Sequence, residues 1–287
     1  LSRPLRDALA DHVVSATKTS RTTLMRQIRT DSRDWNQAIS LKGEHDEVQA
    51  AIAHAATAQL AYAEAVIAVA RKAFPDEWRS LHIYLPTLAS WVGYDLDGRT
   101  DIHWSQSLTF RLAEKASQLG RYAEQLEAMS GSQKIGPLAK LTQRLKAAAD
   151  ETAKHANLFA EDLTDPDNLV PAANALTAHS SRALLDAADI VSVLDDVIPK
   201  ADDQMATGLM ALRAQVEALQ LGTARIHLRV NAAQVRTVIN RDLGLQTEDR
   251  ELGRLALAEL AQKARKSKPV PVNFADLFLE QSTARRQ

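Results

Sequence analysis

A long alanine-rich segment runs from His45 to Phe74, and no other feature of the sequence limits the fold as strongly. Val48, Ile52 and Leu60 recur in it at helical spacing, which predicts a helix that packs closely against its neighbours through small side chains. The 287 residues include only 10 glycines and 9 prolines, the residue types that helix interiors tolerate least. The sequence therefore predicts a mainly α fold built around a helical bundle.

Charge and cysteine content argue against several classes of protein. The 35 basic and 36 acidic residues leave a net charge of −1, so bulk charge favours neither a nucleic-acid nor a membrane partner. No run of about 18 consecutive apolar residues is present, and we expect no membrane span. A chain without cysteine has no disulfide and no thiolate nucleophile. This composition suits a reducing compartment, and we expect a cytoplasmic protein.

Apolar periodicity predicts further helices along the chain. They are expected over residues 5–40 (two helices), 105–129, 138–162, 171–198, 202–220, 232–242 and 248–264, with one more in the tail from Phe274. Gly43 is expected to interrupt the chain before the alanine-rich helix, and Asp165-Pro166-Asp167 to form a turn.

Residues 81–104 interrupt the helical pattern. Pro86, Gly93 and Gly98 lie in this stretch, and three of the four tryptophans lie in or beside it (Trp78, Trp91 and Trp104). Flexible linkers are typically rich in glycine and serine. We therefore expect a structured loop here.

The period changes to two at residues 225–230, where Ile226 and Leu228 alternate with Arg225, His227 and Arg229. This alternation predicts a short β-strand. A strand needs a partner for its N–H and C=O groups, so we expect pairing near residues 82–85 or with strands outside this chain. A start at Leu1 rather than at methionine also indicates an incomplete protein.

The remaining motifs have ordinary alternatives. Residues 44–47 (Glu-His-Asp-Glu) and the pair Glu151 and His155 contain metal-ligand types, but a site needs three or four converging ligands, and a solvated helix face is favoured. Residues 263–268 could contact phosphates, although basic residues are also typical of a helix C-terminus. Neither a nucleophile elbow nor a phosphate-binding loop is present.

Two segments have a clearer chemical meaning. One comprises residues 90–100, and the other is the strand that carries Arg225 and Arg229. A guanidinium offers a rigid fork of donors that matches phosphate or carboxylate. An exposed strand face in water explains the two arginines equally well.

Together these segments resemble the phosphoenolpyruvate carboxylase family, which carries a Ser-Trp-x-Gly-Gly-Asp-Arg-Asp-Gly-Asn-Pro segment. The matching residues are Ser90, Trp91, Gly93, Asp95, Asp97 and Gly98, whereas Tyr94, Leu96, Arg99 and Thr100 depart. The family also has a strand reading Arg-Ile/Leu-Asp-Ile/Leu-Arg-Gln, which residues 225–230 resemble, with His227 and Val230 as departures.

The resemblance implies a lyase that carboxylates phosphoenolpyruvate with bicarbonate, using Mg²⁺ or Mn²⁺, to give oxaloacetate and phosphate. It implies a β-barrel wrapped by helices, usually in a homotetramer. Arg229 corresponds to the family arginine that helps to hold the substrate phosphate, and Arg225 is a weaker candidate. Trp91, Gly93, Asp95, Asp97 and Gly98 form the glycine-rich segment.

The family's metal-binding and catalytic groups lie beyond this strand and have no counterpart before Gln287. We therefore expect residues 1–287 to be a partial domain, divided into a helical part (1–80), the loop segment (81–104), a helical bundle (105–220) and a strand with helices (221–287). Such a segment is expected to bind no metal tightly and to be inactive alone. The alternative is a non-catalytic helical scaffold descended from that family.

Overall fold

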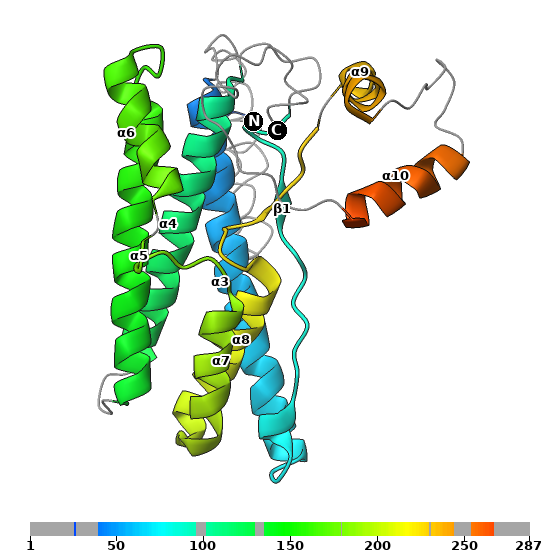
Figure 1. The fold of residues 1–287 in the computed structure, drawn as a ribbon. Helices are drawn as coiled ribbons and strands as arrows, with labels where there is room; N and C mark the ends of the chain where they lie inside the picture. The colour runs from blue at the N-terminus through cyan, green and yellow to red at the C-terminus, as the bar shows by residue number, and fades with distance from the viewer. Residues whose placement is uncertain are drawn as a thin grey trace. The chain divides into compact units, whose positions relative to one another are not determined.

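The computed structural model describes residues 26, 40–95, 102–129, 135–178, 180–229, 231–243 and 254–266. The chain divides into two compact units, Leu1–Glu44 and His45–Gln287, and the fold below is that of the second unit. Its described residues are mainly helical, as predicted (Figure 1). Of the helices expected within residues 5–40, the structure describes only Arg26, which is helical, before residue 40. The helix expected in the tail from Phe274 falls outside the described residues.

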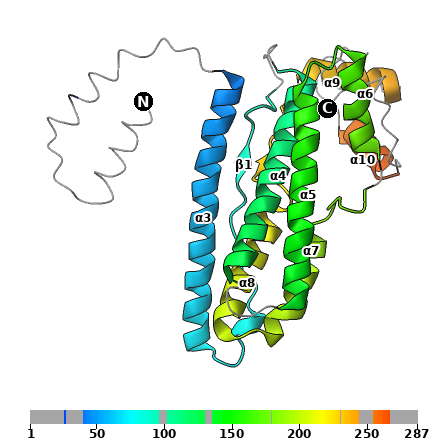
Figure 2. The same ribbon diagram turned by 90° about the vertical axis from the view of Figure 1, so that its left-hand side faces the viewer.

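The helices are α3 (Leu41–Ala73), α4 (Trp104–Met129), α5 (Gly136–Ala160), α6 (Pro166–Thr177), α7 (Ala188–Val197), α8 (Asp203–Leu219), α9 (Ala232–Leu243) and α10 (Arg254–Lys266). Single 3₁₀ turns cover Trp78–Ser80 and Ile198–Lys200. The strands are β1 (Ala89–Ser90) and β2 (Arg225–Ile226). The long helices α4 and α5 pack side by side as a hairpin, and α7 packs on both α5 and α8 (Figures 1 and 2).

The bundle core is made of leucine-rich stripes. The stripes on α5 (Leu138, Leu141, Leu145) and on α8 (Met205, Leu209, Leu212, Val216, Leu219) repeat at helical spacing and are buried. Ile67 of α3, Leu126 of α4 and Leu194 of α7 are fully buried in the same core. The alanine-rich helix therefore contributes one face to the bundle.

The helix predicted over residues 171–198 is wrong, because two helices occupy this region. α6 begins earlier, where Asp165 caps it by accepting from the Asp167 N–H at 2.9 Å. The chain then leaves the helical conformation, and Ser180 Oγ accepts from the Arg182 N–H at 3.1 Å. Short polar side chains compete in this way with helical backbone bonds. The buried stripe of α7 consequently uses Ile190 and Leu194, whereas Ala188 is exposed.

Gly43 does not interrupt the chain before α3, contrary to prediction. The helix begins at Leu41, and Ser40 caps it because its Oγ accepts from the Gly43 N–H at 3.1 Å. The cap holds the glycine within the first helical turn.

The strand predicted over residues 225–230 has a partner inside the chain, but not near residues 82–85. β1 and β2 are parallel, with Ala89 opposite Arg225 and Ser90 opposite Ile226. The regular ladder stops there and resumes as a single bridge between Asp95 and Arg229. A turn between Trp91 and Tyr94 separates the two parts, which is why the strand is shorter than its alternation predicts.

Candidate functional site

The two segments singled out in the sequence lie next to each other. The Arg225 N–H donates to the Leu88 carbonyl at 2.9 Å, and the His227 N–H donates to that of Ser90 at 2.8 Å. The Arg229 N–H donates to the Tyr94 carbonyl at 3.1 Å. Segments distant in the chain are thus held in parallel by backbone hydrogen bonds.

Arg229 forms an ion pair across this ladder. Its Nη1 lies 3.0 Å from Asp95 Oδ2, with side chains 56% and 19% exposed, respectively. A pair this exposed adds at most about 1 kcal/mol to stability. Arg225 and His227 are also exposed, and so is Trp91, at 53%. The arrangement presents cationic side chains to solvent along one short strand.

The backbone of the glycine-rich segment explains why glycine stands at position 93. Gly93 has φ +86°, and a Cβ built on it would lie 2.5 Å from the Phe110 ring. No side chain fits there without strain or displacement of the ring. Two hydrogen bonds also stabilise the turn: Ser107 Oγ donates to the Gly93 carbonyl at 2.7 Å, and Ser90 Oγ accepts from the Val92 N–H at 3.2 Å.

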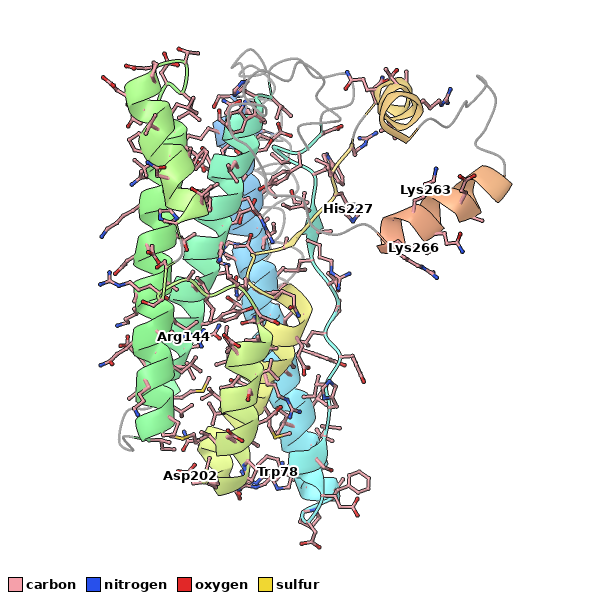
Figure 3. All side chains as sticks on the ribbon, viewed as in Figure 1. Trp78, Arg144, Asp202, His227, Lys263 and Lys266 are labelled. Carbon is pink, nitrogen blue, oxygen red and sulfur yellow. The ribbon has the colours of Figure 1, made fainter. Side chains whose placement is uncertain are left out.

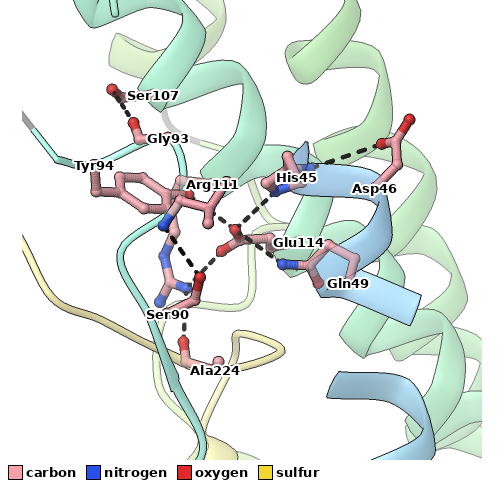
Figure 4. Close-up of polar contacts among 11 residues, drawn as sticks. His45, Asp46, Gln49, Ser90, Gly93, Tyr94, Ser107, Arg111, Glu114 and Ala224 are labelled. Atoms are coloured by element: carbon pink, nitrogen blue, oxygen red, sulfur yellow. Dashed lines mark hydrogen bonds and ion pairs between the residues drawn. The ribbon is translucent and has the colours of Figure 1, made fainter. Parts of the chain in front are cut away.

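A buried carboxylate lies directly behind this turn (Figure 4). Glu114 Oε1 accepts hydrogen bonds from His45 Nε2 at 3.1 Å, Gln49 Nε2 at 3.3 Å and Tyr94 Oη at 3.0 Å. Arg111 Nη1 donates to the other oxygen, Oε2, at 3.3 Å. We call these five residues the Glu114 cluster. Converging donors satisfy a charge that burial would otherwise make costly.

Tyr94 links the Glu114 cluster to the predicted site. Burial raises the pKa of Tyr94 far above its usual value, and the charge and hydrogen bond of Glu114 raise it further. The phenol therefore stays protonated and donates to Glu114. The hydrogen bond from its side chain to Glu114 anchors the turn to α4.

Glu114 and Arg111 were missed by sequence reasoning. A signal for Glu114 existed, because Glu114, Gln118, Tyr122 and Leu126 follow one another at intervals of four along α4 and all four are buried. Glu114 lies one helical turn before Gln118 on the same face of α4, so its carboxylate is expected to be buried as well. A buried carboxylate needs hydrogen-bond donors around it. The donors His45 and Tyr94 come from distant segments, so only the tertiary structure identifies them.

A separate groove of about 1270 Å³ lies between α3, α4 and α8. Its lining includes Glu64, Gln125 and Asp202, together with Arg71, which pairs with Asp203 at 2.6 Å. Figure 3 places Asp202 near Trp78 at the same end of the bundle. None of the predicted site residues that the structure describes lines this groove.

The metal-ligand candidates are engaged elsewhere. His45 belongs to the Glu114 cluster, and Glu151 accepts from Ser180 Oγ at 2.7 Å. Within the described ranges, no group of three or more His, Cys, Asp or Glu side chains converges on a common point.

The basic run 263–268 ends a helix as far as the structure describes it. Lys263, Arg265 and Lys266 lie in the last turn of α10 (Figure 3), where cations suit the helix dipole. Lys263 also pairs with Glu259 at 3.1 Å. Asp97 and Gly98 of the glycine-rich segment fall outside the described residues.

Comparison with models of known protein families, with curated proteins and with solved structures finds no match for this chain.

Proposed function

We propose that the chain is a segment of a phosphoenolpyruvate carboxylase and contributes Arg229 to the substrate-phosphate site of the complete enzyme. That enzyme would carboxylate phosphoenolpyruvate with bicarbonate to give oxaloacetate and phosphate. One observation carries the proposal: the two segments that resemble this family are parallel neighbours, bridged by Asp95 and Arg229. The resemblance rests on residues alone, so their adjacency in space supports it independently.

Arg229 has the chemistry that the role requires. Its guanidinium is partly exposed and is held at one end by Asp95. A fork fixed in this way can direct its remaining N–H donors at a phosphate without first losing rotamer freedom. Charge-assisted contacts to phosphate oxygens would position the substrate and stabilise charge as the phosphoryl group is transferred.

The proposal assigns no metal to these residues. The family resemblance implies that Mg²⁺ or Mn²⁺ would be held by carboxylates in other parts of a longer enzyme. No catalytic step is assigned to this segment, which we expect to be inactive alone.

The second candidate is a non-catalytic scaffold descended from the family. Asp95 already occupies part of the Arg229 fork, and Leu96 replaces the family's arginine in the glycine-rich segment. Both features agree with a chain that has kept the fold of this region but has lost the ability to bind the substrate phosphate.

The deciding experiment measures oxaloacetate formation from phosphoenolpyruvate and bicarbonate with Mg²⁺. It uses the longest chain encoded by the reading frame that contains residues 1–287. We expect activity, and we expect Arg229→Ala to lower kcat/KM by about a hundred- to thousandfold, as loss of one transition-state donor typically does. The control Arg225→Ala should lose less.

Inactivity of the longest chain would reject the enzyme and favour the scaffold. A measurable rate from residues 1–287 alone would show that the segment itself is a catalyst, contrary to the proposal. Because the Arg229–Asp95 pair is exposed, the melting temperature of Arg229→Ala should stay close to that of the parent chain. Lost activity at an unchanged melting temperature would therefore reflect substrate binding or chemistry.

A further inference from the structure

Tyr94 and Asp95 hold Arg229 at two points. The Arg229 N–H donates to the Tyr94 carbonyl at 3.1 Å, and Arg229 Nη1 lies 3.0 Å from Asp95 Oδ2. The ion pair is exposed, so water and salt weaken it and it does not fix the guanidinium alone. The position of Arg229 therefore depends on what fixes the backbone of Tyr94.

The side chain of Tyr94 fixes that backbone to α4. Tyr94 and Glu114 are each 4% exposed, and Tyr94 Oη donates to Glu114 Oε1 at 3.0 Å. The Tyr94 N–H donates to the Trp91 carbonyl at 2.9 Å, which closes the turn around Gly93. A buried hydrogen bond to a charged acceptor is stronger than one that water can replace. Tyr94 thus connects a helix of the bundle with the backbone of Arg229.

Glu114 also reaches the beginning of the strand, through Arg111 (Figure 4). Arg111 Nη1 donates to Glu114 Oε2 at 3.3 Å and to the Ala224 carbonyl at 3.5 Å. Ala224 directly precedes β2, and a Cβ built on Gly222 would overlap the Arg111 guanidinium, so the chain passes close to it. One carboxylate is therefore linked to both ends of residues 224–229, through one side chain at each end.

This support matters because the strand pairing itself is small. β1 and β2 pair over two residues each, and one further bridge joins Asp95 to Arg229. A two-stranded sheet is at best marginally stable by itself. The links to the buried carboxylate of α4 therefore add the support that so short a ladder lacks.

We propose that Glu114 is a positioning residue for Arg229, acting through Tyr94 at one end of the strand and through Arg111 at the other. The inference rests on the proposed function, in which Arg229 binds the substrate phosphate. Glu114 is buried and would not touch the substrate. A displacement of about 1 Å in a group that contacts the substrate can cost up to about a hundredfold in rate. The alternative is that Glu114 only stabilises the fold.

A kinetic double-variant experiment separates positioning from stability in the longest chain encoded by the reading frame. Tyr94→Phe keeps the buried ring and removes its hydrogen bond to Glu114, and we expect it to lower kcat/KM by about tenfold. In the Arg229→Ala background the same change should cost about twofold or less, because Tyr94 acts through Arg229. A loss of stability alone would lower both rates by the same factor. Equal losses in the two backgrounds, or no loss in the parent chain, would overturn the proposal.

Tyr122→Phe is the matched control. It removes another hydroxyl from a buried tyrosine, on α4, which donates to the Gln220 carbonyl at 2.9 Å. Because that hydrogen bond does not involve Glu114, kcat/KM should stay within about twofold of the parent value. A tenfold loss in this control as well would show that any buried hydroxyl of the bundle has the same effect.

Arg111→Lys tests the second link, and it decides the matter if circular dichroism shows that Tyr94→Phe has lost helix content. It keeps the positive charge but lacks the planar fork that donates to Glu114 and Ala224. Its loss of kcat/KM should also disappear in the Arg229→Ala background. A loss that persists there would contradict positioning.

An NMR measurement distinguishes failure of this inference from failure of the proposed function. A parent chain that forms no oxaloacetate would reject the proposed function, and the amide order parameter of Arg229 in residues 1–287 would then decide the positioning. We expect Tyr94→Phe to lower it from about 0.85 toward about 0.6, while the amide of Leu209 in the bundle core keeps its value. An unchanged order parameter at Arg229 would overturn the positioning as well.

Discussion

Replacing Glu114 by alanine is expected to destabilise the chain by about 3–5 kcal/mol. The substitution removes the acceptor of His45 Nε2 and Tyr94 Oη, whose side chains are buried. Each buried donor left without a partner costs about 1–3 kcal/mol. Gln49 and Arg111 are less buried, so water can replace the lost carboxylate and they add little.

The assay is urea denaturation followed by circular dichroism, comparing midpoints at an unchanged slope. Glu127→Ala is the matched control, because Glu127 lies on the same helix but is half exposed and pairs with Lys146 at the surface. That pair should be worth less than about 1 kcal/mol. Equal destabilisation by the two variants would refute the reasoning, because burial and converging donors would then carry no extra weight.

A double variant identifies the contribution of Tyr94. If Glu114 stabilises the fold by accepting from the phenol, Glu114→Ala combined with Tyr94→Phe should cost less than the sum of the two single changes. The combined variant no longer strands the buried hydroxyl. Additive costs would show that the two side chains act independently.

Three other outcomes are expected. Gly93→Ala should lower the free energy of unfolding by about 1–3 kcal/mol, because Gly93 has a positive φ. Gly120→Ala should raise it by about 0.5–1 kcal/mol, because Gly120 lies within a helix and a Cβ there meets open space. Urea denaturation measures both changes. The pKa of Tyr94 is raised in the folded state, so its protonated phenol stabilises the fold below about pH 10 and this contribution is lost as the pH rises further. The melting temperature of Tyr94→Phe should therefore fall less steeply with alkaline pH than that of the parent chain. Leu194→Ala in the core should cost about 2–5 kcal/mol by the same urea assay, and Leu185→Ala at an exposed position about 0.5 kcal/mol or less.

Helices were predictable where their apolar periodicity is strong. The stripes of α5 and α8 are long enough to repeat several times, so the prediction did not depend on any single residue. Prediction failed between α6 and α7, where Asp165 and Ser180 redirect the backbone through local hydrogen bonds that periodicity does not encode. The strand was predicted in the right place, but its length was wrong because the turn at Gly93 belongs to its partner.

The linear sequence by itself determined the mainly helical fold, the buried faces of α5 and α8, and the two candidate site segments, residues 90–100 and 225–230. These properties depend on neighbours three or four positions apart, and such neighbours are visible in the chain. Only the tertiary structure decided that β1 lies beside β2, that Arg229 meets Asp95, and that Glu114 collects donors from α3, α4 and the Gly93 turn. Those contacts join residues far apart in the chain, whose meeting depends on how the helices pack.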